Sequence, residues 1–163
     1  SSGFHSNGFS LVRELVSENN LAYDAPAPFR PSETLGEALL APTRIYVKSC
    51  LPLIHKGLLK ALAHITGGGF TENMQGVLPD GLGCHLDAGG WPFADIFSWL
   101  ASTGPVSGEE MARTFNCGIG MAVIVAPDTV PETRAAREAE GETVHDIGRI
   151  VARGSGRGAI AGR

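Results

Sequence analysis

The chain has 163 residues, of which 43% are hydrophobic and 18% charged, a balance typical of a globular domain and not of a disordered chain. Its formal net charge of −4 argues against general nucleic-acid binding, because a protein that follows a duplex needs a surplus of Lys and Arg. The longest apolar runs, such as residues 121–126, are too short to span a bilayer, so we expect no membrane partner.

Three isolated cysteines, Cys50, Cys84 and Cys117, form neither a C-x-x-C pair nor a disulfide framework. They predict reduced, mostly buried thiols in a cytoplasmic protein. The chain opens on Ser1 without Met and is already within a glycine-rich motif at residue 5. We therefore expect a fragment whose N-terminal part was removed or is encoded upstream.

The first predicted element is a helix, because apolar residues from Phe9 to Val16 recur at helical spacing. Ser6 or Asn7 is its expected N-cap. The loop that follows is predicted to lack regular structure, because it contains Pro26, Pro28 and Pro31.

Two further helices are predicted before residue 60. Thr34 and Glu37 fit a capping box, which opens a short helix through Leu40. Thr43 is expected to cap the next helix, and Pro52 should kink that helix or end it early.

Strands and helices alternate after residue 60. Short strands are predicted at 61–65 and 83–87, and the clearest helix begins at Phe93 and ends at Gly104. The apolar run at 121–126 has the length of a strand and is predicted to be central in a sheet.

A charged helix at 131–140 and a strand at 143–151 complete the predicted elements. This order favours an α/β fold of the α+β type, in which helices cover a mixed β-sheet. We assign residues 1–152 to one α/β domain and residues 153–163, rich in Gly and Arg, to a flexible tail.

Two glycine-rich segments are candidates for chemistry. Ser2–Gly8 opens directly into a helix, an arrangement that can aim backbone amides at an anion, although a tight turn followed by an N-cap has the same pattern. The run Gly67-Gly68-Gly69 lies between a predicted strand and a predicted helix. Consecutive glycines suit a phosphate cradle of backbone amides, and they also suit a flexible connector.

His5 and His64 differ from the other three histidines because each lies within one of these glycine-rich turns. Such a side chain can hydrogen-bond a phosphate or polarise a carbonyl oxygen. The sequence contains no P-loop signature, no G-x-S-x-G elbow and no H-E-x-x-H metal motif. If the protein handles ATP, it does not do so as a P-loop enzyme.

Six stretches of the sequence, taken in order, carry a family resemblance: SSGFHSNGFSLVRELV, LGEALLAPTRIYVKSCLPLI, AHITGGGFTEN, VLPDGLG, FNCGIGMAVIV and IGRIV. The most specific part is the combination of HSNG-x-SLVR with TGGG-x-x-EN. In these stretches the chain resembles the C-terminal domain of the phosphoribosylformylglycinamidine cyclo-ligase family, also called aminoimidazole ribonucleotide synthetase. The resemblance covers nearly the whole chain except the tail.

The resemblance implies a ligase of purine biosynthesis that converts formylglycinamidine ribonucleotide to aminoimidazole ribonucleotide and releases ADP and phosphate. It also implies an N-terminal domain that forms a homodimer and supplies most contacts to ATP and Mg²⁺, while this chain closes the cleft. The chain alone is then expected to be inactive.

Carried onto this sequence, the resemblance assigns Gly67, Gly68 and Gly69 to phosphate binding. His5, Ser6 and Asn7 would line the cleft, with His5 and His64 as catalytic candidates. Thr66 and Asn73 are further substrate-binding candidates, and no residue is assigned to a metal.

One departure from the family pattern follows Asn73, where Met74-Gln75-Gly76 stands in place of the common Pro-Arg. A strong electrostatic role for that position is therefore in doubt. The alternatives are a relative within the superfamily, such as formylglycinamidine ribonucleotide amidotransferase, selenophosphate synthetase, thiamin-phosphate kinase or a hydrogenase maturation factor, and a non-catalytic phosphate-binding or assembly module.

Overall fold

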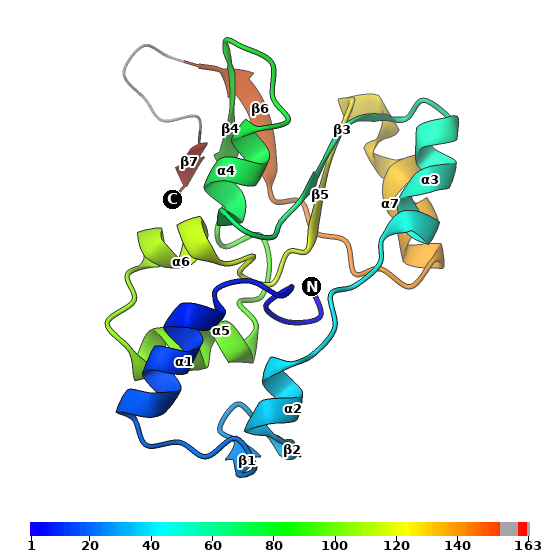
Figure 1. Ribbon diagram of the computed structural model, residues 1–163. Coiled ribbons are helices and arrows are strands. Elements are labelled where there is room, and N and C mark those ends of the chain that lie inside the picture. Colours follow the sequence, from blue (N-terminus) through cyan, green and yellow to red (C-terminus); the bar gives the residue numbers. More distant parts are fainter. Residues whose placement is uncertain (154–159, 163) are drawn as a thin grey trace. The chain divides into compact units, whose positions relative to one another are not determined.

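The computed structural model describes residues 1–153 and 160–162 (Figure 1). Its helices are α1 (Phe9–Glu18), α2 (Leu35–Leu39), α3 (Val47–His55), α4 (Gly69–Gln75), α5 (Asp95–Thr103), α6 (Gly108–Thr114), the 3₁₀ helix η1 (Pro127–Thr129) and α7 (Val130–Ala139). Its strands are β1 (Pro26–Ala27), β2 (Arg30–Thr34), β3 (Leu59–His64), β4 (Leu82–Leu86), β5 (Met121–Val125), β6 (Gly148–Ala152) and β7 (Ile160–Gly162). This mixture of helices and small sheets confirms the predicted fold class.

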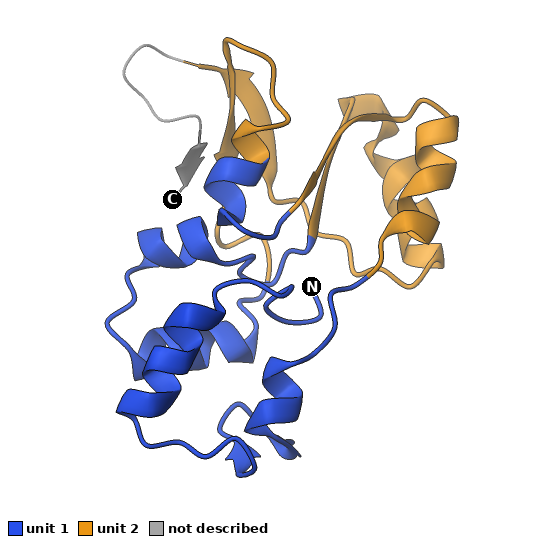
Figure 2. Cartoon of the chain, viewed as in Figure 1, with its two compact units in different colours: residues 1–44, 65–73, 92–120 blue, residues 45–64, 74–91, 121–163 orange. Residues whose placement is uncertain are grey.

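Two compact units make up the chain, and each contains segments from several parts of the sequence (Figure 2). Unit 1 comprises Ser1–Arg44, Ile65–Asn73 and Pro92–Gly120. Unit 2 comprises Ile45–His64, Met74–Trp91 and Met121–Arg163. The assignment of residues 1–152 to a single domain stays a prediction.

The core of unit 1 is aromatic. The rings of Phe4, Phe97 and Phe115 are fully buried, and their centroids lie 5.3 to 6.0 Å apart. Helix α1 packs on α5 and buries Val12 and Leu15, as its helical spacing predicts. The segment just before α1 therefore has a rigid foundation, because Phe4 belongs to the same core.

Unit 2 contains two small sheets. Strands β3 and β5 pair antiparallel, and the second sheet has the order β6-β4-β7, in which β4 is antiparallel to β6 and parallel to β7. Helix α3 packs on α7, and the Ser49 hydroxyl donates a 2.8 Å hydrogen bond to the Glu142 carboxylate just after α7.

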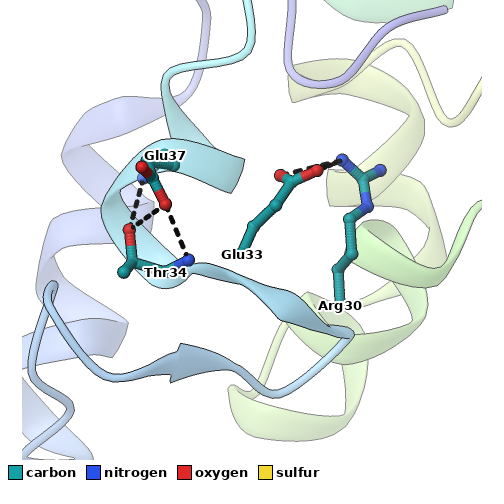
Figure 3. Close-up of polar contacts among 4 residues, drawn as sticks. All are labelled: Arg30, Glu33, Thr34 and Glu37. Carbon is teal, nitrogen blue, oxygen red and sulfur yellow. Dashed lines mark hydrogen bonds and ion pairs between the residues drawn. The ribbon is translucent and has the colours of Figure 1, made fainter.

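The capping box predicted at Thr34 is present (Figure 3). The Glu37 amide donates to Thr34 Oγ1 at 3.3 Å, and the Thr34 amide donates to Glu37 Oε2 at 3.0 Å. The bonds from the backbone and side chain of Thr34 hold the pKa of Glu37 below its usual range. Figure 3 also shows the exposed 3.2 Å ion pair between Arg30 and Glu33.

Three local predictions are wrong. The proline-rich loop contains a two-stranded antiparallel sheet, β1–β2. Proline has no backbone N–H to donate, but it is tolerated on edge strands, and both strands of a two-stranded sheet are edge strands. Helix α3 begins at Val47 rather than after Thr43. Helix α1 has Gly8 as its N-cap, in the left-handed conformation and without a side-chain cap.

Strand β5 was predicted to be central in a sheet, and this is also wrong. Within the described residues it pairs with β3 alone, and most of its side chains are half-buried. A continuous apolar run indicates that both faces of a strand are covered by other parts of the protein, but it does not indicate how many strands pair with that strand.

The predicted tail at 153–163 lies largely outside the described residues. In the part of this tail that the structure describes, the Arg153 amide donates to the Gly81 carbonyl at 2.8 Å, and Ile160–Gly162 forms β7. All three cysteines are buried thiols, as predicted. No helix in the described ranges is long and apolar enough to cross a bilayer.

Candidate functional site

The histidine loop, which we define as Ser2–Asn7, turns sharply before α1. His5 and Ser6 have φ angles of 53° and 56°, so two consecutive residues other than glycine adopt the left-handed conformation. Such residues cost about 1–3 kcal/mol each and persist where the surrounding structure holds them. His5 is 3% exposed, and its Nε2 accepts a 3.4 Å hydrogen bond from the Ser2 amide. The loop is therefore strained and held in place.

Gly8 is the residue that lets this loop meet α1. Its φ angle is 76°, and a Cβ atom at this position would lie 2.1 Å from the ring of Phe115. A side chain there would clash with the aromatic core and would also force an unfavourable backbone conformation. The sequence pattern identified the loop but not this steric reason for its glycine.

The glycine loop, Thr66–Gly69, leads into α4. Gly68 and Gly69 have φ angles of 86° and 54°, and a Cβ atom on Gly69 would lie 2.2 Å from the Ala112 carbonyl oxygen. The Gly69 amide donates to the Thr66 carbonyl at 3.1 Å. Within the described residues, the amides of Gly67 and Gly68 have no hydrogen-bond acceptor. These two N–H groups are the donors that the loop can offer to an anion.

Asn73 holds the glycine loop from one side. Its amide nitrogen donates to the carbonyls of Gly67 and Gly69, each at 2.7 Å. Both N–H donors of the side chain are then in use, since a carboxamide has two. Asn73 thus positions the loop. Its predicted contact with a ligand stays a prediction, and without breaking these two bonds only the side-chain oxygen of Asn73 could make that contact.

Asn7 joins the histidine loop to the glycine loop. Its amide nitrogen donates to the carbonyl of Thr114 at the end of α6 and to that of Thr66, the latter at 3.5 Å. Its Oδ1 would lie 3.4 Å from a Cβ atom built on Gly67. The two glycine-rich segments, which are about sixty residues apart in the sequence, therefore lie side by side in unit 1.

A third loop, which we call the asparagine loop, spans Asn116–Gly120 and supports the histidine loop. Asn116 is 1% exposed; its amide donates to the Gly3 carbonyl at 2.7 Å, and its Oδ1 accepts from the Gly118 amide at 2.9 Å. From the sequence this segment could be either a third loop on the same edge as the glycine-rich segments or an ordinary turn into the following strand. The signal for it was an Asn followed by Gly two residues later, which is common in ordinary turns.

The remaining predicted residues occupy different places. The Ser6 hydroxyl lies 3.1 Å from that of Thr43, on the exposed side of unit 1. His64 is the last residue of β3 in unit 2, where its ring centroid lies 5.7 Å from that of Tyr46. Of the predicted residues, the structure brings together His5, Ser6 and Asn7 with Thr66, the three glycines and Asn73 in unit 1.

Two charged or ionisable groups bear on what the loops can bind. A Cβ atom on Gly68 would lie 2.3 Å from Glu72 Oε2, so an exposed carboxylate stands beside the glycine loop and opposes an anion there. Burial raises the pKa of the Cys117 thiol in the asparagine loop to about 12, which keeps it protonated. The described residues contain no group of three His, Cys, Asp or Glu side chains suited to a metal ion.

Comparison with known proteins bears on the fold and its three loops. A protein-family model described as AIR synthase related protein, C-terminal domain, matches residues 1–160. The chain belongs to this family. The match includes all three loops of this AIR synthase related domain, and it confirms the superfamily to which the sequence resemblance pointed. That superfamily includes ATP-dependent enzymes with different reactions, of which the cyclo-ligase is one.

Proposed function

We propose that this AIR synthase related domain forms the C-terminal half of the active site of an ATP-dependent cyclo-ligase. The reaction would close formylglycinamidine ribonucleotide to aminoimidazole ribonucleotide, with release of ADP and phosphate. ATP would supply the phosphoryl group that turns the formyl oxygen into a leaving group. A neighbouring amidine nitrogen would then attack the activated carbon, and the C–O bond to the phosphate would break.

The observation that supports this proposal best is the glycine loop. The backbone amides of Gly67 and Gly68 in this loop have no acceptor among the described residues. The Asn73 side chain holds the loop through the carbonyls of Gly67 and Gly69. Amides fixed in this way bind an anion without first having to be ordered, so less entropy is lost on binding. We propose that this loop binds a phosphate group, namely the ribose phosphate of the substrate.

The histidine loop would line the same cleft. Asn7 fixes the distance between the two loops, and the strained backbone at His5 and Ser6 is the kind of feature that clusters at active sites. In this proposal His5 acts near the reacting groups, and Ser6 and Thr66 contact substrate. The catalytic role that the resemblance assigns to His64, which belongs to unit 2, stays a prediction of the sequence. Close positioning of the reacting groups is the main contribution that such a domain makes, because oriented reactants avoid a large entropic cost.

ATP and Mg²⁺ are proposed to bind mainly to an N-terminal domain, which would also form a homodimer. On this chain, the described residues provide no metal cluster, and Glu72 stands beside the amides that would receive a phosphate. The exposed Glu72 side chain would have to turn away from the loop when phosphate binds.

The test joins this chain to its N-terminal domain and measures ADP and aminoimidazole ribonucleotide with formylglycinamidine ribonucleotide and Mg²⁺. We expect Gly68→Val to abolish product formation, because the side chain would collide with Glu72 and displace the loop whose amides would receive the phosphate. The matched control is Gly57→Val, since Gly57 also has a positive φ of 70° but has no atom within 4 Å of its Cβ position. The control carries the same backbone strain and should retain activity.

The other outcomes separate the alternatives. ADP formed only with a different acceptor would move the function to another member of the superfamily, such as formylglycinamidine ribonucleotide amidotransferase. No ADP with any acceptor, together with phosphate binding that Gly68→Val abolishes, would make the domain a phosphate-binding module. Equal activity of the Gly68→Val and Gly57→Val variants would contradict the assignment of the glycine loop.

A further inference from the structure

Helix α3 exposes its aliphatic side chains. Val47, Leu51 and Ile54 follow one another at spacings of four and three residues, so they lie along one face of the helix. Their exposed fractions are 63%, 43% and 46%, and Ile45, just before the helix, is 82% exposed. We call these four residues the α3 stripe; all of them belong to unit 2.

The other face of α3 is less apolar than the exposed one. It packs on α7 (Figure 1) and buries Ser49 and Cys50 together with Leu53. The sulfur of Cys50 accepts a 3.0 Å hydrogen bond from Arg137 on α7. A surface helix usually turns its aliphatic residues towards the core, and a helix that is apolar on both faces is usually covered on both. Because contiguous exposed apolar patches mark interaction surfaces in soluble proteins, we expect a partner to cover the α3 stripe.

The charges beside the α3 stripe are compensated within the chain. Lys48 pairs with Glu140 at 2.8 Å, and Lys56 pairs with Glu132 at 3.3 Å. Lys48 lies near one end of α3 and Lys56 directly after the other, so each end of the stripe has an ion pair beside it. The stripe itself contains no ionisable residue. An apolar centre with a polar rim is the usual anatomy of a protein–protein interface.

Two further ionisable residues lie at the ends of the stripe and do not belong to it. Arg44 precedes Ile45, and His55 is the last residue of α3. An acidic partner would therefore meet these two groups only at the exposed rim, where an ion pair contributes little to affinity. The surface that matches the centre of the stripe is another uncharged aliphatic stripe.

We propose that the α3 stripe is the contact between two copies of this chain, related by a two-fold axis that passes near Leu51. A patch with an apolar centre and compensated charges at both ends is complementary to itself, as a two-fold contact requires. The stripe presents roughly 400 Å² of apolar surface per copy, so two copies bury about 800 Å², less than the roughly 1,200 Å² of a stable complex. The dimer is therefore weak and reversible. It is separate from the homodimer proposed for the N-terminal domain, and it uses none of the residues assigned to the cyclo-ligase reaction.

Sedimentation velocity of the chain at concentrations from about 0.02 to about 1 mM tests the proposal, because this range covers weak dimers. We expect the weight-average sedimentation coefficient to rise with concentration. Leu51→Glu should weaken dimerisation at least about tenfold, since it places a charge in an apolar contact. The matched control is Tyr23→Glu, which replaces a side chain of similar exposure, 48%, in unit 1 and should leave dimerisation unchanged. Dimerisation should also persist at about 0.5 M salt, which weakens contacts between exposed charges but not apolar ones.

Crosslinking keeps the test decisive if Leu51→Glu does not fold. All three native cysteines are buried, so Leu51→Cys and its control Tyr23→Cys each add one accessible thiol. A residue near a two-fold axis meets its own copy, and a disulfide can form when the two Cα atoms lie within about 7 Å. Under mild oxidation we expect Leu51→Cys to form the covalent dimer at least about fivefold faster than Tyr23→Cys, because association raises the local thiol concentration.

Four results would each overturn the proposal. They are a chain that stays monomeric up to about 1 mM, dimerisation that high salt weakens several-fold, equal dimerisation of the two Glu variants, and equal crosslinking of the two Cys variants.

Discussion

Asn116 offers the sharpest test of how the histidine loop is held. Its side chain is 1% exposed and bridges two backbone groups, the Gly3 carbonyl at 2.7 Å and the Gly118 amide at 2.9 Å. Asn116→Ala removes both partners at once. Gly3 is itself buried, so solvent cannot readily replace the lost donor.

The magnitude follows from the two groups that lose their partners. The buried Gly3 carbonyl without a partner costs about 1–3 kcal/mol, and the half-buried Gly118 amide costs less because water can reach it, so the free energy of unfolding should fall by roughly 1–4 kcal/mol. The matched control is Asn19→Ala at the exposed end of α1, where the side chain donates a single 2.9 Å bond to the Leu15 carbonyl. That change should cost no more than about 1 kcal/mol, because water can take over the bond.

Urea denaturation followed by circular dichroism measures both variants against the unsubstituted chain. Amide hydrogen exchange then reports where Asn116→Ala loosens the fold, and we expect faster exchange at the turn formed by Phe4 and Asn7. A loss below about 1 kcal/mol, or one equal to that of Asn19→Ala, would refute the view that Asn116 holds the histidine loop.

Three further predictions concern charge and protonation. Glu72→Gln should strengthen inorganic phosphate binding at the glycine loop about two- to fivefold in a low-salt titration, because it removes a nearby exposed carboxylate; unchanged affinity would place the anion elsewhere. Burial raises the pKa of Cys117 to about 12, above the pKa of the same thiol in the unfolded chain. The folded state therefore favours the neutral thiol, and this contribution to stability is fully present below the unfolded pKa and is lost as pH rises towards 12. Urea melts between pH 8 and about 10.5 should therefore show falling stability, with a shallower slope in Cys117→Ala. In an NMR titration, Thr34→Ala should raise the lowered pKa of Glu37 only part of the way, because the Thr34 backbone amide is the larger cause and remains; complete recovery would assign the effect to the hydroxyl alone.

The amino-acid sequence by itself determined the elements whose causes are local. Helices α1, α5 and α7 follow from apolar and charged residues at helical spacing, and the box at Thr34 and Glu37 forms between residues three positions apart. Hydrogen bonds and side-chain contacts over three or four residues form in the same way in almost any tertiary context. The glycine-rich segments could also be recognised as candidates from the sequence, because their composition is unusual.

Only the tertiary structure decided how those segments act. Ser6 and Asn7 have the composition of N-caps, but their side chains bond to Thr43 and to the carbonyls of Thr66 and Thr114, which are 37 to 107 residues away. The supporting role of Asn116 depends on Gly3, at the other end of unit 1 in sequence. A polar side chain takes whichever buried partner the fold brings within about 3 Å, and local spacing carries no information about a partner that distant in the chain.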